Sequence, residues 1–232
     1  MRMQSLVTGL SLRTSSSRVS SLGFTLTQAP GGCPTVTLPN LRLLVLEQEA
    51  PGAPGLLLHS SQPLPSSLDG LPCSSLPVKG GGGGGWGQST PHPNGVTRCD
   101  HLVVRSPDWA RTSGALEKLG FKEALVKTDV YPGTRLSFWR VGGQGKGLTL
   151  ELVAPLVTKE GQGGPASLWG ATWLAGGGLE EVAGALGPGL ELGASKSAVQ
   201  GQGRKIATLK GPEAHKLGLA MAFITPKTIT RN

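Results

Sequence analysis

The stretch that decides the fold runs from Asp100 to Trp109 and reads Asp-His-Leu-Val-Val-Arg-Ser-Pro-Asp-Trp. Its apolar run predicts a short buried strand, and the Ser-Pro-Asp that follows is typical of the start of a helix. The glycine at position 120 is expected to end that helix. Three more strands, each bounded by a turn signal, are predicted at residues 121–127, 134–141 and 148–153. The segment therefore has the order β-α-β-β-β.

The same order of elements is predicted twice more in the chain. Residues 165–226 contain a strand, a helix that ends at Gly187 and three further strands. Residues 5–51 contain a looser copy, in which Leu22-Gly-Phe24 matches Leu119-Gly-Phe121. A repeat of this size cannot bury its sheet alone, so the copies are expected to pair. We therefore predict an α+β protein built of repeated βαβββ modules.

A change in composition divides the chain. Residues 59–95 are dominated by Ser, Pro and Gly, include an uninterrupted run from Gly80 to Gly85, and are predicted to be a flexible linker. Residues 1–58 before it are predicted to form the degenerate first module. Residues 96–226 after it are predicted to form one domain, followed by a short tail, with module and tail boundaries at 96–155, 165–226 and 227–232.

The net charge of +8 does not by itself indicate a nucleic-acid partner. Basic residues are spread singly, with no run longer than Arg204-Lys205, and aromatics make up only 4% of the chain. Nucleic-acid binding needs a concentrated basic surface, so we expect no such partner. No apolar run approaches the ~18 residues needed to span a bilayer, so we expect no membrane partner. Three cysteines without CxxC spacing favour a reducing compartment.

The amino-terminal stretch supports two interpretations. The first 46 residues contain four arginines, many serines and no acidic residue, which is typical of an organelle transit peptide. The same residues also predict the strands of the first module. We therefore expect a soluble intracellular protein, located in the cytoplasm or in an organelle.

The repeated module, well over residues 96–226 and loosely over residues 5–51, resembles the glyoxalase-like vicinal oxygen chelate superfamily, which includes bleomycin-resistance proteins and dioxygenases. The resemblance rests on Asp100-His-Leu-Val-Val104 at its start and Leu148-Thr-Leu-Glu-Leu-Val-Ala-Pro155 at its end. It implies that two modules place their sheets side by side as an open bowl-like mixed sheet. It also implies a divalent metal ion held by the first and last strands, with His101 and Glu151 as metal ligands and Glu151 as a catalytic residue.

The implied ligand set is half of the family's usual four. The matching positions in the last module are Ala171 and Ala222, which cannot bind a metal. In the first module Glu47 matches the glutamate, but Gly9 falls where the histidine is expected. A complete site would need water, substrate oxygens, or ligands from another module or a second chain, so a homodimer is compatible with the sequence.

His101 and Glu151 therefore have two interpretations. In the first, they bind a divalent cation of unknown identity that chelates two adjacent substrate oxygens. In the second, they are remnants of a ligand set, with His101 hydrogen-bonded and Glu151 paired with a base such as Arg135 or Arg105.

Other side chains on or next to predicted strands are expected to line the bowl and bind substrate, namely Arg135, Trp139, Trp173 and Arg204. Arg204 offers a planar donor fork for a carboxylate or phosphate. Trp169 and Trp173 are four residues apart on one strand, so both are predicted to face the same side, where one fills the core and the other the pocket.

Two classes of function follow from the resemblance. The protein binds a small oxygen-rich molecule in the bowl as a metal-dependent lyase, isomerase or dioxygenase. Alternatively, it is a metal-free small-molecule binding or sequestration module of the bleomycin-resistance type, or a catalytically inactive structural relative. The expected partner in each binding case is a small-molecule ligand.

Overall fold

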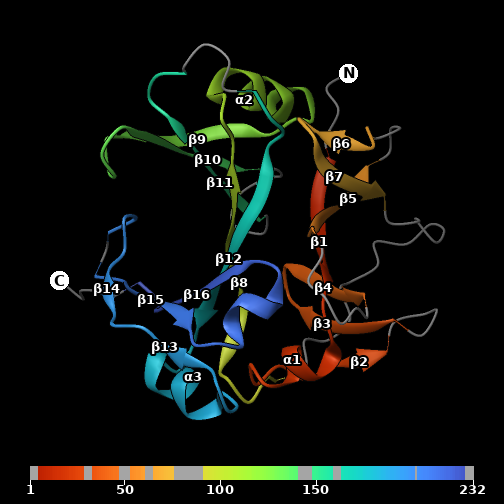
Figure 1. Ribbon diagram of the computed structural model, residues 1–232, viewed down its shortest axis with the longest axis vertical. Coiled ribbons are helices and arrows are strands. Elements are labelled where there is room, and N and C mark those ends of the chain that lie inside the picture. Colours follow the sequence, from red (N-terminus) through yellow and green to blue (C-terminus); the bar gives the residue numbers. More distant parts are fainter. Residues whose placement is uncertain are drawn as a thin grey trace.

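The computed structural model describes residues 5–28, 33–46, 53–60, 65–75, 91–140, 148–158, 163–201 and 203–227. These residues form two mixed sheets that stand side by side, one built from the first third of the chain and the other from the remainder (Figure 1). The Gly80–Gly85 run and Glu47, which the sequence singled out, lie outside the described residues. None of the described helices is long and apolar enough to cross a membrane.

The larger sheet consists of two βαβββ halves. The first half contains, in order, β8 (Val96–Arg105), α2 (Trp109–Lys118), β9 (Lys122–Thr128), β10 (Thr134–Arg140) and β11 (Thr149–Pro155). The second half contains β12 (Ser167–Ala175), α3 (Leu179–Ala185), β13 (Glu191–Leu192), β14 (Lys196–Ser197), β15 (Lys205–Lys210), the 3-10 helix η1 (Ala214–Leu217) and β16 (Ala220–Ile224). This confirms the predicted α+β class and element order.

The strand order of this sheet places the ends of each half next to its beginning. β8 pairs in parallel with β11, β12 pairs in parallel with β16, and β8 joins β12 antiparallel at the centre. Alternation then sorts the side chains: Leu150 and Leu152 of β11 enter the core, whereas Thr149, Glu151 and Val153 face the other way. The first and last strands of both halves therefore lie together at the middle of one curved sheet.

The smaller sheet follows the same pairing pattern. It contains β1 (Ser5–Arg13), α1 (Ser16–Ser20), β2 (Thr27–Gln28), β3 (Pro34–Leu38), β4 (Leu41–Leu46), β5 (Gly55–Ser60), β6 (Ser67–Leu68) and β7 (Leu71–Ser75). β1 pairs in parallel with β4 and antiparallel with β5, and β5 pairs in parallel with β7. The predicted β-α-β-β-β order of the first module is thus present, and β5 to β7 form a shortened fourth unit without a helix.

The linker predicted for residues 59–95 therefore begins too early in the sequence. β5 continues to Ser60, and β6 and β7 pair antiparallel within the stretch expected to be structureless. Leu68 and Leu71 are almost completely buried, and these two leucines anchor the short hairpin in the core. The sequence pattern did not indicate this hairpin, because the residues around the two leucines are rich in serine and proline.

The two sheets share one hydrophobic core. Buried residues of β1, β4 and β5 belong to the same cluster as those of β8, β11 and β12. Polar contacts add to it: the Asp69 carboxylate accepts from Arg111 Nε at 2.5 Å and from the Thr112 hydroxyl, and the Thr14 hydroxyl donates to the Lys216 carbonyl at 3.0 Å. The first sheet therefore packs against the second through this shared core.

Asn40, in the turn between β3 and β4, makes the closest polar contact of this kind to the site described below. Its Nδ2 donates to the Cys99 carbonyl at 2.6 Å, and its Oδ1 accepts from the Cys99 amide at 3.0 Å. β11 pairs with β8 only from His101 onward. At Cys99, Asn40 therefore makes the two hydrogen bonds that a neighbouring strand would otherwise make.

Replacing Asn40 with alanine is expected to lower the free energy of unfolding by about 1–3 kcal/mol. The substitution leaves the amide and carbonyl of buried Cys99 without partners from the first sheet. Urea unfolding followed by tryptophan fluorescence measures the change. Thr37→Ala, in the neighbouring strand β3, is the control, and an equal loss in both variants would contradict a specific role for Asn40.

Candidate functional site

An irregularity in β8 sets the geometry of the site. In the pairing of β8 with β12, His101 lies opposite Thr172 and Cys99 opposite Trp173, so Asp100 is an extra residue without a partner. Such a β-bulge redirects the neighbouring side chains. Cys99 consequently enters the core, rather than sharing a face with His101 as strict alternation suggested. The bulge also brings the side chains of two consecutive residues, Asp100 and His101, into contact.

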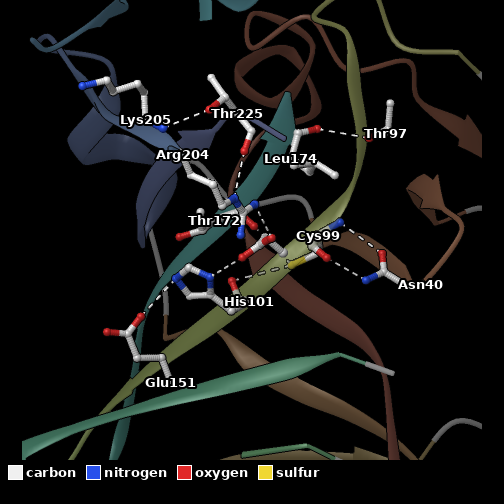
Figure 2. A network of polar contacts seen from close by, with 11 residues as sticks. Asn40, Thr97, Cys99, His101, Glu151, Thr172, Leu174, Arg204, Lys205 and Thr225 are labelled. Carbon is white, nitrogen blue, oxygen red and sulfur yellow. Dashed lines mark hydrogen bonds and ion pairs between the residues drawn. The ribbon is translucent and has the colours of Figure 1, made fainter. Parts of the chain in front are cut away.

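His101 is held at both ring nitrogens. Its Nδ1 lies 2.9 Å from Asp100 Oδ2, and its Nε2 lies 3.0 Å from Glu151 Oε2 (Figure 2). Behind it, Arg204 Nη2 donates to Asp100 Oδ1 at 2.6 Å, and Arg204 Nε donates to the Thr225 carbonyl at 2.9 Å. Alternating charges therefore form a line from Arg204 through Asp100 and His101 to Glu151, which we call the charge chain.

The charge chain determines the protonation of its buried members. Burial on its own would lower the pKa of His101, but its hydrogen bonds to Asp100 and Glu151 and their negative charges raise that pKa to about 9. Burial would raise the pKa of Asp100, but hydrogen bonds from His101 and Arg204 and their charges hold it well below its usual range. At neutral pH His101 is therefore an imidazolium between two carboxylates.

The charge chain ends at a large cavity on the open face of the larger sheet. The cavity has a volume of about 820 Å³, within the range of small-molecule sites. His101, Glu151 and Thr172 belong to its wall, together with apolar side chains from β8, β11, β15 and β16. This cavity is the bowl that the resemblance implied, and it opens directly onto the histidine–glutamate pair.

The residues of the bowl do not fit a resident divalent metal ion. A metal needs the lone pair of a neutral imidazole, yet both nitrogens of His101 already contact carboxylates. Asp100 at Nδ1 does resemble the partner that orients a ligating histidine, but Nε2 is taken by Glu151. In the part of the chain that the structure describes, no cluster of three His, Cys, Asp or Glu side chains could hold a metal.

The register of the last module differs by one residue from the sequence comparison. Thr172, not Ala171, lies beside His101, and it pairs with Ala222 on β16. Ala171 is buried in the core, whereas Thr172 and Ala222 line the bowl. The second module therefore contributes a hydroxyl and a methyl group where the family pattern places ligands, so the conclusion that it supplies no strong metal ligand stands.

The four residues expected to bind substrate lie away from the bowl. Trp139 and Trp173 are almost fully buried in the core. The Arg135 guanidinium lies 3.4 Å from the ring centroid of Trp109, on the side of β10 that faces α2. Arg204 is buried and bound to Asp100, so it acts on the bowl only through the charge chain. Glu151 pairs with His101, and not with Arg135 or Arg105 as the second interpretation held.

A second bulge explains why Trp173, which was expected to line the bowl, lies in the core while Trp169 lines the bowl. Leu168 pairs with Val104 and Gly170 with Val103, so Trp169 is the extra residue of β12 and turns into the bowl. It is 41% exposed, whereas Trp173, four residues on, is fully buried. The expectation of one tryptophan in the core and one in the pocket is correct, but the bulge assigns Trp169 to the pocket.

Sequence reasoning missed several residues of the site. Asp100 and Thr172 flank His101, and Tyr131 and Lys196 belong to the cavity wall. The Asp-His dipeptide was the available signal for Asp100, but regular alternation assigns its two side chains to opposite faces. Nothing in the sequence pattern indicated that Lys196, in a two-residue strand, would reach the bowl.

The fold and the bowl place this chain in a structural class: it has the fold of the glyoxalase-like vicinal oxygen chelate superfamily. A mutant form of 4-hydroxymandelate synthase from Streptomyces coelicolor superposes with a TM-score of 0.59 at 13% identity, covering 99% of this chain and 94% of that one. Methylmalonyl-CoA epimerase from Mycobacterium tuberculosis matches with a TM-score of 0.45 at 17% identity, covering 58% of this chain and 91% of that one. No family model and no curated protein sequence matches the chain. At 13% identity, the superposition on 4-hydroxymandelate synthase establishes the fold alone.

Proposed function

We propose that this protein binds a small oxygen-rich molecule in the bowl without a metal ion. The observation that carries the proposal is the double engagement of His101, whose two ring nitrogens contact Asp100 and Glu151 where the cavity opens. The histidine at the position of a metal ligand is therefore engaged in ion pairs with two carboxylates instead. It supports the metal-free alternative of the two classes that the sequence left open.

Glu151 is the residue that would anchor the ligand. One of its carboxylate oxygens, Oε2, contacts His101, and its side chain belongs to the cavity wall. The other oxygen is then the acceptor for a hydroxyl of the ligand, and the Thr172 hydroxyl is a second polar group on the floor. The imidazolium fixes the orientation of Glu151, so the acceptor is preorganised before a ligand enters.

The experiment is a thermal-shift screen of small hydroxy and oxo compounds in the presence of EDTA. Ligands that bind the folded protein raise its melting temperature, by mass action. We expect bound compounds to lose their effect in Ala222→Phe, in which a phenyl ring fills the floor of the bowl. Ala110→Phe, on an exposed position of α2, is the matched control and should behave as the wild type.

A metal measurement provides the contrary outcome. We expect protein purified without chelator to contain no stoichiometric divalent metal, and calorimetric titration with Mn²⁺ or Zn²⁺ to show no site near equimolar ratio. A stoichiometric metal that disappears in His101→Ala would overturn the metal-free proposal. Binding of screened compounds that survives in Ala222→Phe would place the ligand outside the bowl.

A further inference from the structure

Two cations with aromatic partners line the bowl. Arg105, the last residue of β8, places its guanidinium carbon 4.0 Å from the ring centroid of Trp169. Lys196, on β14, places its Nζ 5.9 Å from the ring centroid of Tyr131. All four side chains line the cavity and are largely exposed, so they form its mouth.

The charges of the mouth are not balanced. Within the described residues, neither Arg105 nor Lys196 forms an ion pair or hydrogen bond with an acidic side chain. Glu151 is the one acidic side chain of the described cavity wall, and its Oε2 already contacts His101 Nε2 at 3.0 Å. A molecule that enters the bowl therefore meets an uncompensated positive field at the mouth, which favours an anion.

The position of Arg105 beside Trp169 favours a particular kind of anion. The guanidinium carbon lies over the indole ring of Trp169, and no acidic side chain among the described residues forms an ion pair with its fork of N–H groups. A carboxylate accepts two parallel hydrogen bonds from such a fork. Trp169 thus acts as a support that holds the donor edge at the mouth, and a long lysine such as Lys196 adds a point charge.

The wall between mouth and floor is apolar. Val103, Val153 and Ile206 come from three different strands and cover this part of the cavity. A ligand that spans it needs an apolar body, and a ring buries a large area at low conformational cost. The size of the cavity, about 820 Å³, accommodates such a body.

We infer that the ligand of the bowl is an aryl carboxylate, with its carboxylate on Arg105 at the mouth and its ring against the apolar wall. This inference rests on the proposed function, because it names the class of molecule that the bowl takes. It adds a specificity-determining residue, Arg105, and a supporting residue, Trp169, that neither the fold nor the charge chain requires.

Calorimetric titration with four probes tests the inference. Phenylacetate carries both features, 2-phenylethanol lacks the charge, phenylethylamine reverses it, and acetate lacks the ring. We expect phenylacetate to bind at least about tenfold more tightly than 2-phenylethanol, and the other two not to bind. Raising the salt concentration should weaken phenylacetate binding and leave 2-phenylethanol unchanged.

Variants locate the contact. Arg105→Gln is expected to weaken phenylacetate binding about tenfold or more without changing the affinity for 2-phenylethanol, and Lys196→Gln to weaken it severalfold. Arg98→Gln, on an exposed position of the same strand outside the cavity, is the matched control and should bind as the wild type. Circular dichroism checks that each variant is folded. If Arg105→Gln does not fold, Lys196→Gln still tests the inference.

The outcomes separate this inference from the proposed function. Equal affinities for phenylacetate and 2-phenylethanol, both abolished in Ala222→Phe, would overturn the carboxylate and leave binding in the bowl intact. An unchanged phenylacetate affinity in both Arg105→Gln and Lys196→Gln would likewise overturn it. If no probe binds, the aryl carboxylate class is wrong, and the wider screen of oxygen-rich compounds decides the proposed function by itself.

Discussion

Replacing Arg204 with methionine is expected to lower the free energy of unfolding by about 3 kcal/mol or more. Arg204 is only 6% exposed and neutralises Asp100 through a 2.6 Å contact. Methionine keeps the length of the side chain but leaves a buried carboxylate with His101 as its remaining partner. The desolvation cost of Asp100 is then no longer offset from both sides. Urea unfolding followed by tryptophan fluorescence gives the change directly.

The adjacent residue provides the control. Lys205→Met changes the same charge at an exposed position and should alter stability by less than about 0.5 kcal/mol. Adding Asp100→Asn to Arg204→Met should recover part of the loss, because the buried charge is removed together with its partner. A loss below about 1 kcal/mol in Arg204→Met would mean that the charge chain contributes little to the stability of the fold.

The second large effect is a loss of stability at alkaline pH. His101 has a folded-state pKa raised to about 9, against about 6.5 in an unfolded chain. Because the folded form binds this proton more tightly, its contribution is complete below about pH 6.5 and disappears as the pH rises through 9. The contribution is on the order of 3 kcal/mol at most. Unfolding free energies measured between pH 6 and about 10 reveal it.

Two comparisons assign this alkaline loss to His101. In His101→Gln the decrease between pH 6.5 and 9 should flatten, since the titrating group is gone. The buried cysteines Cys73 and Cys99 lose stability of their own only above their ordinary pKa of 9.0, because burial raises the pKa of Cys73 to about 11 and that of Cys99 well above its ordinary value. A pH profile in His101→Gln that matches the wild type would show that the imidazolium is not the source.

Acid also destabilises this cluster, through Asp100. The pKa of Asp100 lies well below its usual range in the folded protein, so its contribution is present above about pH 4 and is lost as the pH falls further. The charge chain is therefore most stabilising in the interval where Asp100 is ionised and His101 is protonated.

Periodicity and turn signals were enough to predict most elements of the fold. The strands around His101 and Glu151, the helix after Arg105 and the repetition of the module all follow from apolar spacing and from the placement of glycine and proline. These signals are local, and each of the elements concerned buries a clear apolar face. The hairpin of β6 and β7 was missed because two leucines in a Ser- and Pro-rich segment carry little local signal.

The site was predictable only in part. His101 and Glu151 were correctly placed on one face of neighbouring strands, because the alternation from His101 to Arg105 and from Thr149 to Val153 is regular. Arg204 and Trp173 were predicted to line the bowl, but their positions depend on bulges at Asp100 and Trp169, which are produced by the pairing of β8 with β12. Pairing between strands far apart in sequence leaves no periodic trace in either strand, so these assignments were wrong.

The bulge at Asp100 makes chain length, and not only residue identity, a determinant of the site. β8 contains one residue more than β12 between the pairs at Cys99 and His101. Deleting Asp100 would therefore remove the bulge and leave Cys99 and His101 paired with Trp173 and Thr172 in regular alternation. Cys99 would remain on the core side, but Arg204 would lose the carboxylate that it contacts and His101 would lose the partner of its Nδ1. A single-residue deletion at this point would thus break the charge chain and keep the register of the strand, whereas a deletion at a regular position of β8 would reverse the faces of the residues before it.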